Sequence, residues 1–245
     1  MQTTYYKEYS TNLERDMEFK VYGHGGKPCI VFPCQNGRFF DFESFQMTDI
    51  AAPWIDECKL QLFCVDSIDL ESWSDTYGDP RHRSEMQERY FNYIIDELVP
   101  RIHKINGSGL KLIATGCSMG ATHSGIVALR RPDIFDSCIC MSGFYHAGYF
   151  FGNYMDDLVY NNSPVDFIAN MPDDHPYIDM YNNNRFIFCV GQGAWEDELL
   201  DSTRRLQAVF QQKGIQCWVD IWGFDVNHDW PWWRKQFPYF LDKII

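Results

Sequence analysis

Six short apolar runs, separated by segments with helical periodicity, constrain the fold of this chain more than any other feature. The runs are mostly unbroken, as in strands that are buried on both faces of a sheet. They lie at residues 28–33, 59–66, 110–115, 136–143, 185–193 and 215–223. The helical segments lie at residues 79–105, 121–133, 195–214 and 230–245. This alternation predicts an α/β fold, a mainly parallel sheet with helices on both faces.

The N-terminal segments follow a different pattern. Residues 3–11 and 16–23 alternate polar with apolar side chains, and the sequence NLER separates them. Such alternation predicts an antiparallel pair of strands at one edge of the sheet. The 245 residues are enough for one sizeable core, and we expect a single domain over residues 1–245.

Residues 144–184 interrupt the alternation of runs and helices. They are rich in Tyr, Asn, Asp and Phe, contain three prolines, and show one short helical piece after the sequence NNSP. About forty residues without structure are improbable inside a compact domain. We therefore expect a small cap or lid over the functional site, with an ordered surface excursion as the alternative.

Charge and cysteine usage exclude several classes of protein. The net charge of −13 repels phosphate backbones and anionic lipid, which excludes nucleic acid and membrane surfaces as partners. No apolar run reaches 18 residues, and the first residues lack the pattern of a signal peptide, so we expect a cytoplasmic protein. Most of the nine cysteines lie inside apolar runs without a C-x-x-C pair, which predicts buried thiols and no metal site.

The sequence GCSMG at residues 116–120 joins a predicted strand to a predicted helix. A sharp strand-to-helix turn leaves no room for Cβ atoms beside the serine, which gives both glycines a role. Ser118 Oγ would then be exposed above the sheet, at a helix N-terminus that favours a developing anion. We expect Ser118 to be a nucleophile, with an ordinary tight bend as the alternative. The Cys117 side chain should point away from the base, so a thiol nucleophile is disfavoured.

A serine nucleophile needs a histidine that accepts its proton, and in a parallel sheet this histidine comes from a loop at the carboxyl ends of the strands. His228 follows the last predicted strand, in the loop GFDVNHDWPWW. The chain order serine, acid, histidine is that of α/β-hydrolases. We therefore expect His228 to be the base. His123 lies five residues after the serine on the same helix, so we expect it to be packed rather than catalytic.

The carboxylate that orients this histidine should follow the strand predicted at 185–193. The sequence AWEDE places Glu196, Asp197 and Glu198 there, at a helix start that favours acidic residues in any case. Glu196 is nearest to the strand end and is our first choice, with Asp197 as the alternative. Asp225 and Asp229 are weaker candidates, because close sequence neighbours seldom reach the far imidazole nitrogen.

An oxyanion hole at this site needs the backbone N–H of the residue after the nucleophile, Met119, and a second N–H from the loop after the third strand. That loop has the sequence FPCQNGRFFDFESF at residues 32–45. It lacks the HGGG run of many lipases, so Gln35 and Asn36 both remain candidates for the second donor.

The segments GCSMG, VGQGAWEDE and FDVNHDWPWWRKQFPYFL together resemble the putative esterase family of α/β-hydrolases, which is related to esterase D and the antigen 85 acyltransferases. The resemblance covers nearly the whole chain. It implies acyl transfer from an ester to water or to a hydroxyl, without a metal or an organic cofactor. By position it assigns the family's roles to Ser118, His228 and Met119. Related enzymes usually have a single Asp where this chain has Glu196 and Asp197.

These observations predict an α/β-hydrolase that acts as a serine esterase on a small-molecule ester through an acyl-enzyme. The alternatives are acyl transfer to an alcohol acceptor and an inactive binding protein with the same fold. Aromatic residues in loops predicted to face the site suit an aryl, acyl or sugar-bearing ester, although half of them also fit a core. The expected pocket residues are Phe39, Trp73, Trp195 and Trp230.

Overall fold

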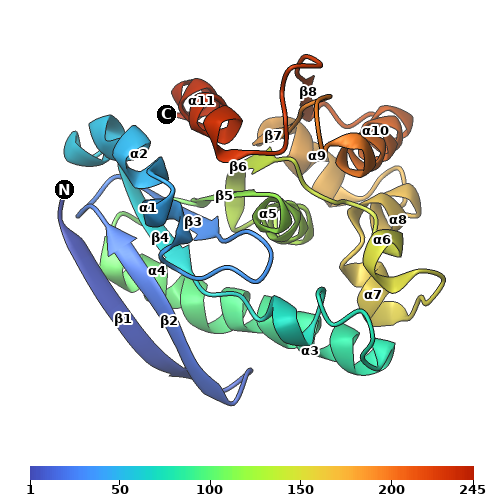
Figure 1. Ribbon diagram of the computed structural model, residues 1–245, viewed down its shortest axis with the longest axis horizontal. Coiled ribbons are helices and arrows are strands. Elements are labelled where there is room, and N and C mark those ends of the chain that lie inside the picture. The colour runs from blue at the N-terminus through green and yellow to red at the C-terminus, as the bar shows by residue number, and fades with distance from the viewer.

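The computed structural model describes residues 1–245 and contains one eight-stranded sheet (Figure 1). The strands are β1 (Thr3–Ser10), β2 (Arg15–Tyr22), β3 (Lys27–Phe32), β4 (Leu60–Val65), β5 (Leu112–Cys117), β6 (Phe135–Met141), β7 (Arg185–Val190) and β8 (Trp218–Ile221). Their order across the sheet is β1-β2-β4-β3-β5-β6-β7-β8. Only the β1–β2 and β2–β4 pairs are antiparallel, so the predicted parallel sheet with an antiparallel N-terminal edge is confirmed.

The central strand β5 lies between β3 and β6 and leads directly to GCSMG. It ends at Cys117, two residues beyond the predicted end of this run at 115. Every residue of β4 and β5 is buried, which explains why these strands appear in the sequence as unbroken apolar runs. The last strand, β8, is shorter than the apolar run at 215–223 and its side chains are only half-buried or exposed.

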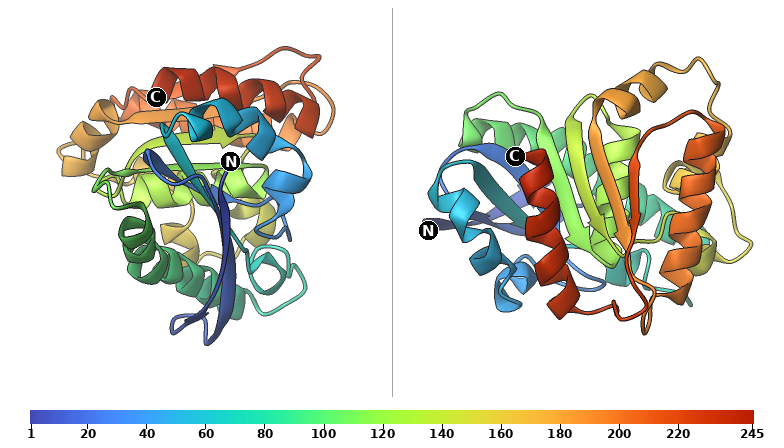
Figure 2. Two further views of the ribbon diagram at one scale, coloured as in Figure 1. Left: turned by 90° about the vertical axis from the view of Figure 1, so that its left-hand side faces the viewer. Right: turned by 90° about the horizontal axis from the view of Figure 1, so that it is seen from above.

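Helices cover both faces of the sheet (Figures 1 and 2). On one face lie α2 (Met47–Asp56) and α11 (Trp230–Ile244), which pack together over the smaller of two cores. On the other face lie α3 (Pro80–Asn92), α4 (Val99–Asn106), α5 (Met119–Arg130) and α10 (Asp197–Gln212), over the larger core. The π-helical stretch η2 (Tyr93–Leu98) joins α3 to α4, so the predicted helix at 79–105 is one continuous segment.

Residues 41–56 form two helices that the sequence analysis did not predict, α1 (Asp41–Ser44) and α2. The residue before α2, Gln46, has a left-handed backbone and makes no side-chain capping bond, and Pro53 lies inside the helix. The segment thus lacks the capping residue that marks a helix start and contains a residue that normally ends one. Its helical structure follows from burial of one apolar face against the sheet.

The excursion between β6 and β7 contains four short helices, α6 (Gly148–Phe151), α7 (Asp157–Asn161), α8 (Pro164–Ala169) and α9 (Pro176–Asn183). The helix α8 is the short piece expected after NNSP. Side chains from the excursion, such as Tyr145 and Ile168, belong to the same core as α5 and α10. A lid role for this segment stays a prediction. No helix of the chain combines the length and the apolar character that a membrane span requires.

Candidate active site

Ser118 lies at the turn between β5 and α5, at the carboxyl end of the parallel strands. Its backbone has φ 57° and ψ −124°, a strained conformation for a residue with a Cβ. A Cβ on Gly120 would lie 2.3 Å from the Phe32 carbonyl oxygen, and a Cβ on Gly116 would lie 2.5 Å from the Gly120 backbone. The two glycines of GCSMG therefore allow the chain to reverse tightly around Ser118.

His228 lies beside Ser118, in the loop between β8 and α11. Its Nε2 is 2.9 Å from Ser118 Oγ. The Trp233 ring packs edge-on against the imidazole, with the ring centres 4.9 Å apart. The His228 N–H donates to the Ala194 carbonyl at 3.0 Å, which ties this loop to the loop after β7. The backbone bond and the ring contact together hold one imidazole nitrogen toward the serine hydroxyl.

Glu196 is the carboxylate beside the other imidazole nitrogen. It is fully buried, and its Oε2 lies 3.5 Å from His228 Nδ1. Asp197, the alternative acid, is exposed and makes no hydrogen bond with His228. Successive residues at a helix start point about 100° apart, so the burial of Glu196 directs Asp197 away from the imidazole.

Ser142 is a further member of this cluster that the sequence analysis did not single out. It follows β6, is fully buried, and has a left-handed backbone with φ 59°. Its hydroxyl donates to Glu196 Oε1 at 2.7 Å and accepts the Trp233 indole N–H at 3.4 Å. In the sequence, Ser142 could have been noticed as a serine that stands before Gly143 at the end of an apolar run. Its conformation and its partner, however, follow only from the packing of β6 beside β7.

The backbone N–H groups of Met119 and Gln35, the two expected oxyanion donors, have no hydrogen-bond acceptor within the protein. Met119 is the first residue of α5, where a helix leaves its N–H groups unsatisfied. The Asn36 N–H donates to Asp69 Oδ2 at 3.2 Å instead. The close approach of the chain after β3 to Gly120 brings this loop against the first turn of α5.

Two aromatic residues that were expected in a substrate pocket lie elsewhere. Trp73 is only 1% exposed, because its indole packs in the core and donates to Gln87 Oε1 at 2.8 Å. Phe39 packs against Tyr5 of the edge strand β1, with ring centres 5.6 Å apart. Three strands separate β1 from β5, and each spacing is about 4.8 Å, so Phe39 points away from Ser118. Both expectations were wrong because sequence position did not indicate side-chain direction.

Trp195 precedes Glu196 in the loop after β7, and Trp230 is the first residue of α11, directly after the loop of His228. Trp195 is 83% exposed and has a left-handed backbone with φ 67°. Trp230 is half-buried and stacks on Phe45, with ring centres 4.2 Å apart and planes 7° from parallel. Phe45 belongs to the loop after β3, so this stack joins the start of α11 to the loop of Gln35.

The competing nucleophile and the competing base are both buried. Burial raises the pKa of the Cys117 thiol well above its usual range, which keeps the thiol protonated and unreactive at neutral pH. His123 is 2% exposed, as expected for a packed histidine, and its Nε2 lies 2.9 Å from Asp69 Oδ1. No group of three or more His, Cys, Asp or Glu side chains is arranged to bind a metal ion.

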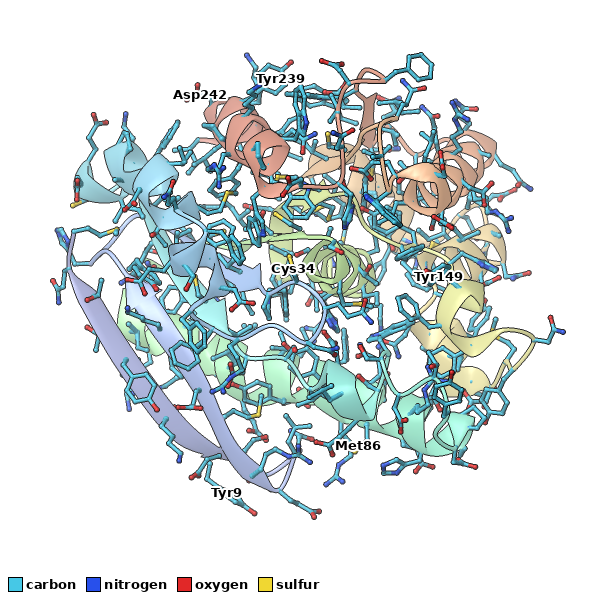
Figure 3. The ribbon with its side chains drawn as sticks, viewed as in Figure 1. Tyr9, Cys34, Met86, Tyr149, Tyr239 and Asp242 are labelled. Atoms are coloured by element: carbon cyan, nitrogen blue, oxygen red, sulfur yellow. The ribbon has the colours of Figure 1, made fainter.

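A cavity of about 570 Å³ lies between the start of α10 and the segment after β6. Phe144 and Tyr149 stack in its wall, with ring centres 4.3 Å apart, and Asp197 and Glu198 line the opposite side. Figure 3 shows Tyr149, a residue of α6, to the right of α5, with Cys34 nearer to α5. Ser118 and His228 are not among the residues that line the cavity.

Comparison with known proteins assigns a family and a fold. The sequence profile of the family described as "Putative esterase" matches residues 10–244. No curated protein matches the sequence. Among solved structures, a ferulic acid esterase has 14% identity and a TM-score of 0.78, with 100% of this chain and 99% of that chain covered.

Two further solved structures are similar over nearly their whole length. An S-formylglutathione hydrolase from Staphylococcus aureus has 13% identity and a TM-score of 0.69, with 99% of each chain covered. MPT51 from Mycobacterium tuberculosis has 14% identity and a TM-score of 0.71, with 100% of this chain and 98% of that chain covered. At such identities the likeness concerns the fold, and it confirms the expected α/β-hydrolase architecture.

The tight turn at Ser118 predicts that Gly120→Ala destabilises the protein. Its Cβ would overlap backbone atoms, which cannot move as the end of a side chain can, and such overpacking costs about 1–3 kcal/mol. Gly25→Ala is the matched control, because a Cβ there meets nothing within 4 Å. Urea unfolding should show a lower free energy of unfolding for Gly120→Ala alone. Equal stability of the two variants would mean that the turn has room for a side chain.

Proposed function

The chain belongs to the putative esterase family, and on that premise we propose that it is a serine esterase with the triad Ser118, His228 and Glu196. The proposal rests on the contacts that align these three side chains. Ser118 Oγ lies 2.9 Å from His228 Nε2, and Glu196 Oε2 lies 3.5 Å from His228 Nδ1. The substrate is a small-molecule carboxylic ester.

In the first half-reaction, Ser118 Oγ attacks the ester carbonyl carbon while His228 Nε2 takes the hydroxyl proton. Glu196 accepts the Nδ1 proton of His228 in a hydrogen bond and offsets the positive charge on the imidazolium. The carbon–oxygen bond to the alcohol then breaks, and the imidazolium gives its proton to the departing alkoxide. The acyl group stays on Ser118 as an ester.

The negative charge that develops on the carbonyl oxygen is stabilised by two backbone donors, the N–H groups of Met119 and Gln35. Both lack an acceptor in the free enzyme, so no protein hydrogen bond is lost when the oxyanion forms. Asn36, the alternative donor, is the weaker candidate because its N–H already donates to Asp69.

In the second half-reaction, water repeats the attack on the acyl-enzyme. His228 Nε2 removes a proton from the water as its oxygen adds to the acyl carbon, and the same two N–H groups hold the oxyanion. The bond to Ser118 Oγ then breaks, His228 returns the proton to this oxygen, and a carboxylic acid leaves. Every group that these steps need belongs to the chain.

The substrate contacts that we propose lie on either side of the triad. Trp195 and Trp230 provide aromatic surface on the loops of Glu196 and His228. The cavity beside α10, with the stacked Phe144 and Tyr149, receives the remaining part of the ester, so the 144–184 segment acts as a wall of the substrate site. The similarity to a ferulic acid esterase supports an ester with an aromatic part.

The nucleophile is tested by Ser118→Ala. Hydrolysis of a p-nitrophenyl ester should fall by about 10³-fold or more, since triad members act as a unit. A fluorophosphonate probe should label the unmodified enzyme at Ser118, located by peptide mass spectrometry, and leave the variant unlabelled. Retained hydrolysis in the variant would remove Ser118 from the mechanism.

The acid is tested by comparing Glu196→Gln with Asp197→Asn. The first change removes the charge that stabilises the imidazolium, so kcat should fall by roughly 10² to 10⁴ with little change in KM. The second removes an exposed carboxylate in the cavity wall, so any effect should fall on KM rather than kcat. Steady-state kinetics on one ester measures both. A larger fall of kcat in Asp197→Asn would transfer the role to Asp197.

The rival nucleophile is tested with a thiol reagent. Because burial raises the pKa of the Cys117 thiol, this thiol stays protonated at pH 7–8 and should not react with iodoacetamide in the folded enzyme. Ester hydrolysis should therefore persist after treatment, although exposed Cys58 becomes alkylated. Loss of activity together with alkylation of Cys117 would contradict this assignment.

A further inference from the structure

A second buried carboxylate–imidazole pair lies outside the proposed triad. His123 Nε2 is 2.9 Å from Asp69 Oδ1, and the two side chains are 2% and 0% exposed. Neither side chain contacts Ser118 or His228 through a hydrogen bond. Burial of a carboxylate costs free energy unless hydrogen-bond donors compensate for the lost water. The pair therefore requires a structural or functional reason.

His123 is fixed relative to one oxyanion donor. It lies one helical turn after Met119 on α5, so the two residues share a face of the same helix. Its ring packs against Phe32 at the end of β3 and against Tyr90 of α3, with ring centres 5.7 and 5.2 Å apart. The imidazole thus projects from the helix of Met119 toward the strand that leads to Gln35.

Asp69 is fixed relative to the other oxyanion donor. Its Oδ2 accepts the Asn36 N–H at 3.2 Å, and its carbonyl accepts the Ser74 N–H at 2.8 Å. The Ser74 hydroxyl in turn accepts the side-chain amide of Gln35 at 2.8 Å. Asn36 has a left-handed backbone with φ 58°, and a bond from the Gly37 N–H to the Cys34 carbonyl closes the turn. Two bonds from the 69–74 segment therefore fasten the loop of Gln35.

We propose that the Asp69–His123 pair positions the two backbone N–H donors of the oxyanion hole. One carboxylate oxygen binds the helix that presents the Met119 N–H, and the other binds the loop that presents the Gln35 N–H. A single buried carboxylate thus sets the separation of the two donors. This inference rests on the proposed function, because it concerns the same oxyanion hole.

The magnitudes agree with such a role. Hydrogen bonds to a carboxylate are stronger than those between neutral groups, so the pair restrains the loop strongly. A misplacement of about 1 Å in a catalytic group can lower the rate by roughly 10²-fold. Loss of one oxyanion donor lowers kcat by about 10² to 10³-fold. A loosened loop should therefore affect the transition state far more than substrate binding.

The test uses the double variant Asp69→Leu/His123→Phe. Replacing both partners by apolar groups of similar shape removes the buried carboxylate without leaving an unpaired charge. The Asn36 N–H then loses its acceptor, and the loop is no longer held by this bond. We expect kcat for a p-nitrophenyl ester to fall by about 10²-fold with little change in KM. Affinity for an aryl trifluoromethyl ketone, which forms an oxyanion when Ser118 Oγ adds to its carbonyl, should fall by the same factor.

Two further variants separate positioning from stability. Asp69→Asn keeps an acceptor for the Asn36 N–H and a polar partner for His123, so it should retain most of the activity that the double variant loses. Glu88→Leu/Arg130→Met is the matched control, because this largely buried ion pair lies at the other end of α5. It should lower the melting temperature without changing kcat or ketone affinity. Equal losses of kcat in the control and the double variant would overturn the proposal.

A measurement on the unmodified enzyme keeps the proposal testable even where variants fold poorly. In ¹⁵N-labelled protein, formation of the ketone adduct should move the amide proton signals of Gln35 and Met119 downfield, while the Asn36 signal stays in place. Movement of Asn36 instead of Gln35 would overturn the proposal. Failure of the unmodified enzyme to form the adduct would count against the proposed function, whereas an adduct with unaltered affinity in the double variant would count against this inference alone.

Discussion

The left-handed backbone at Ser118 is the constraint on which the rest of the site depends. It is possible only because Gly116 and Gly120 let β5 and α5 approach without a Cβ between them. The same close approach brings the chain after β3 against the first turn of α5, which is where Gln35 leaves its N–H free. One local backbone conformation thus fixes Ser118, the proposed nucleophile, and also determines which loop lies beside it.

Other residues around Ser118 also have a positive backbone φ. Seven residues other than glycine have positive φ, and four of them follow strands at the carboxyl edge of the sheet: Asn36, Ser118, Ser142 and Trp195. Ser118 and Ser142 come directly after β5 and β6, and Asn36 and Trp195 lie in the loops after β3 and β7. Such conformations persist only where surrounding contacts determine them, and they cluster where a site needs fixed geometry. Here the packed sheet and its two cores provide the contacts that hold these conformations.

The sequence predicted the elements of the site whose position depends on strand ends. Ser118, Glu196 and His228 each follow an apolar run that forms a parallel strand, and parallel strands bring their carboxyl ends to one edge, so their proximity followed from topology alone. The failures concern side-chain direction. Trp73 turns into the core and Phe39 toward β1, although both lie in loops at the correct edge. The helix α2 was missed because its stability comes from tertiary burial, without a cap and despite an internal proline.

Two buried carboxylates, Glu196 and Asp69, have similar surroundings. Glu196 lies between His228 and the Ser142 hydroxyl, and Asp69 lies between His123 and a backbone N–H. The difference between the two histidines is which nitrogen the carboxylate engages. Glu196 lies beside Nδ1, which leaves Nε2 of His228 facing the serine, whereas Asp69 occupies Nε2 of His123. On the proposed roles, the first arrangement leaves Nε2 of His228 available as a base, whereas the second engages Nε2 of His123 and connects α5 to the loop of Gln35.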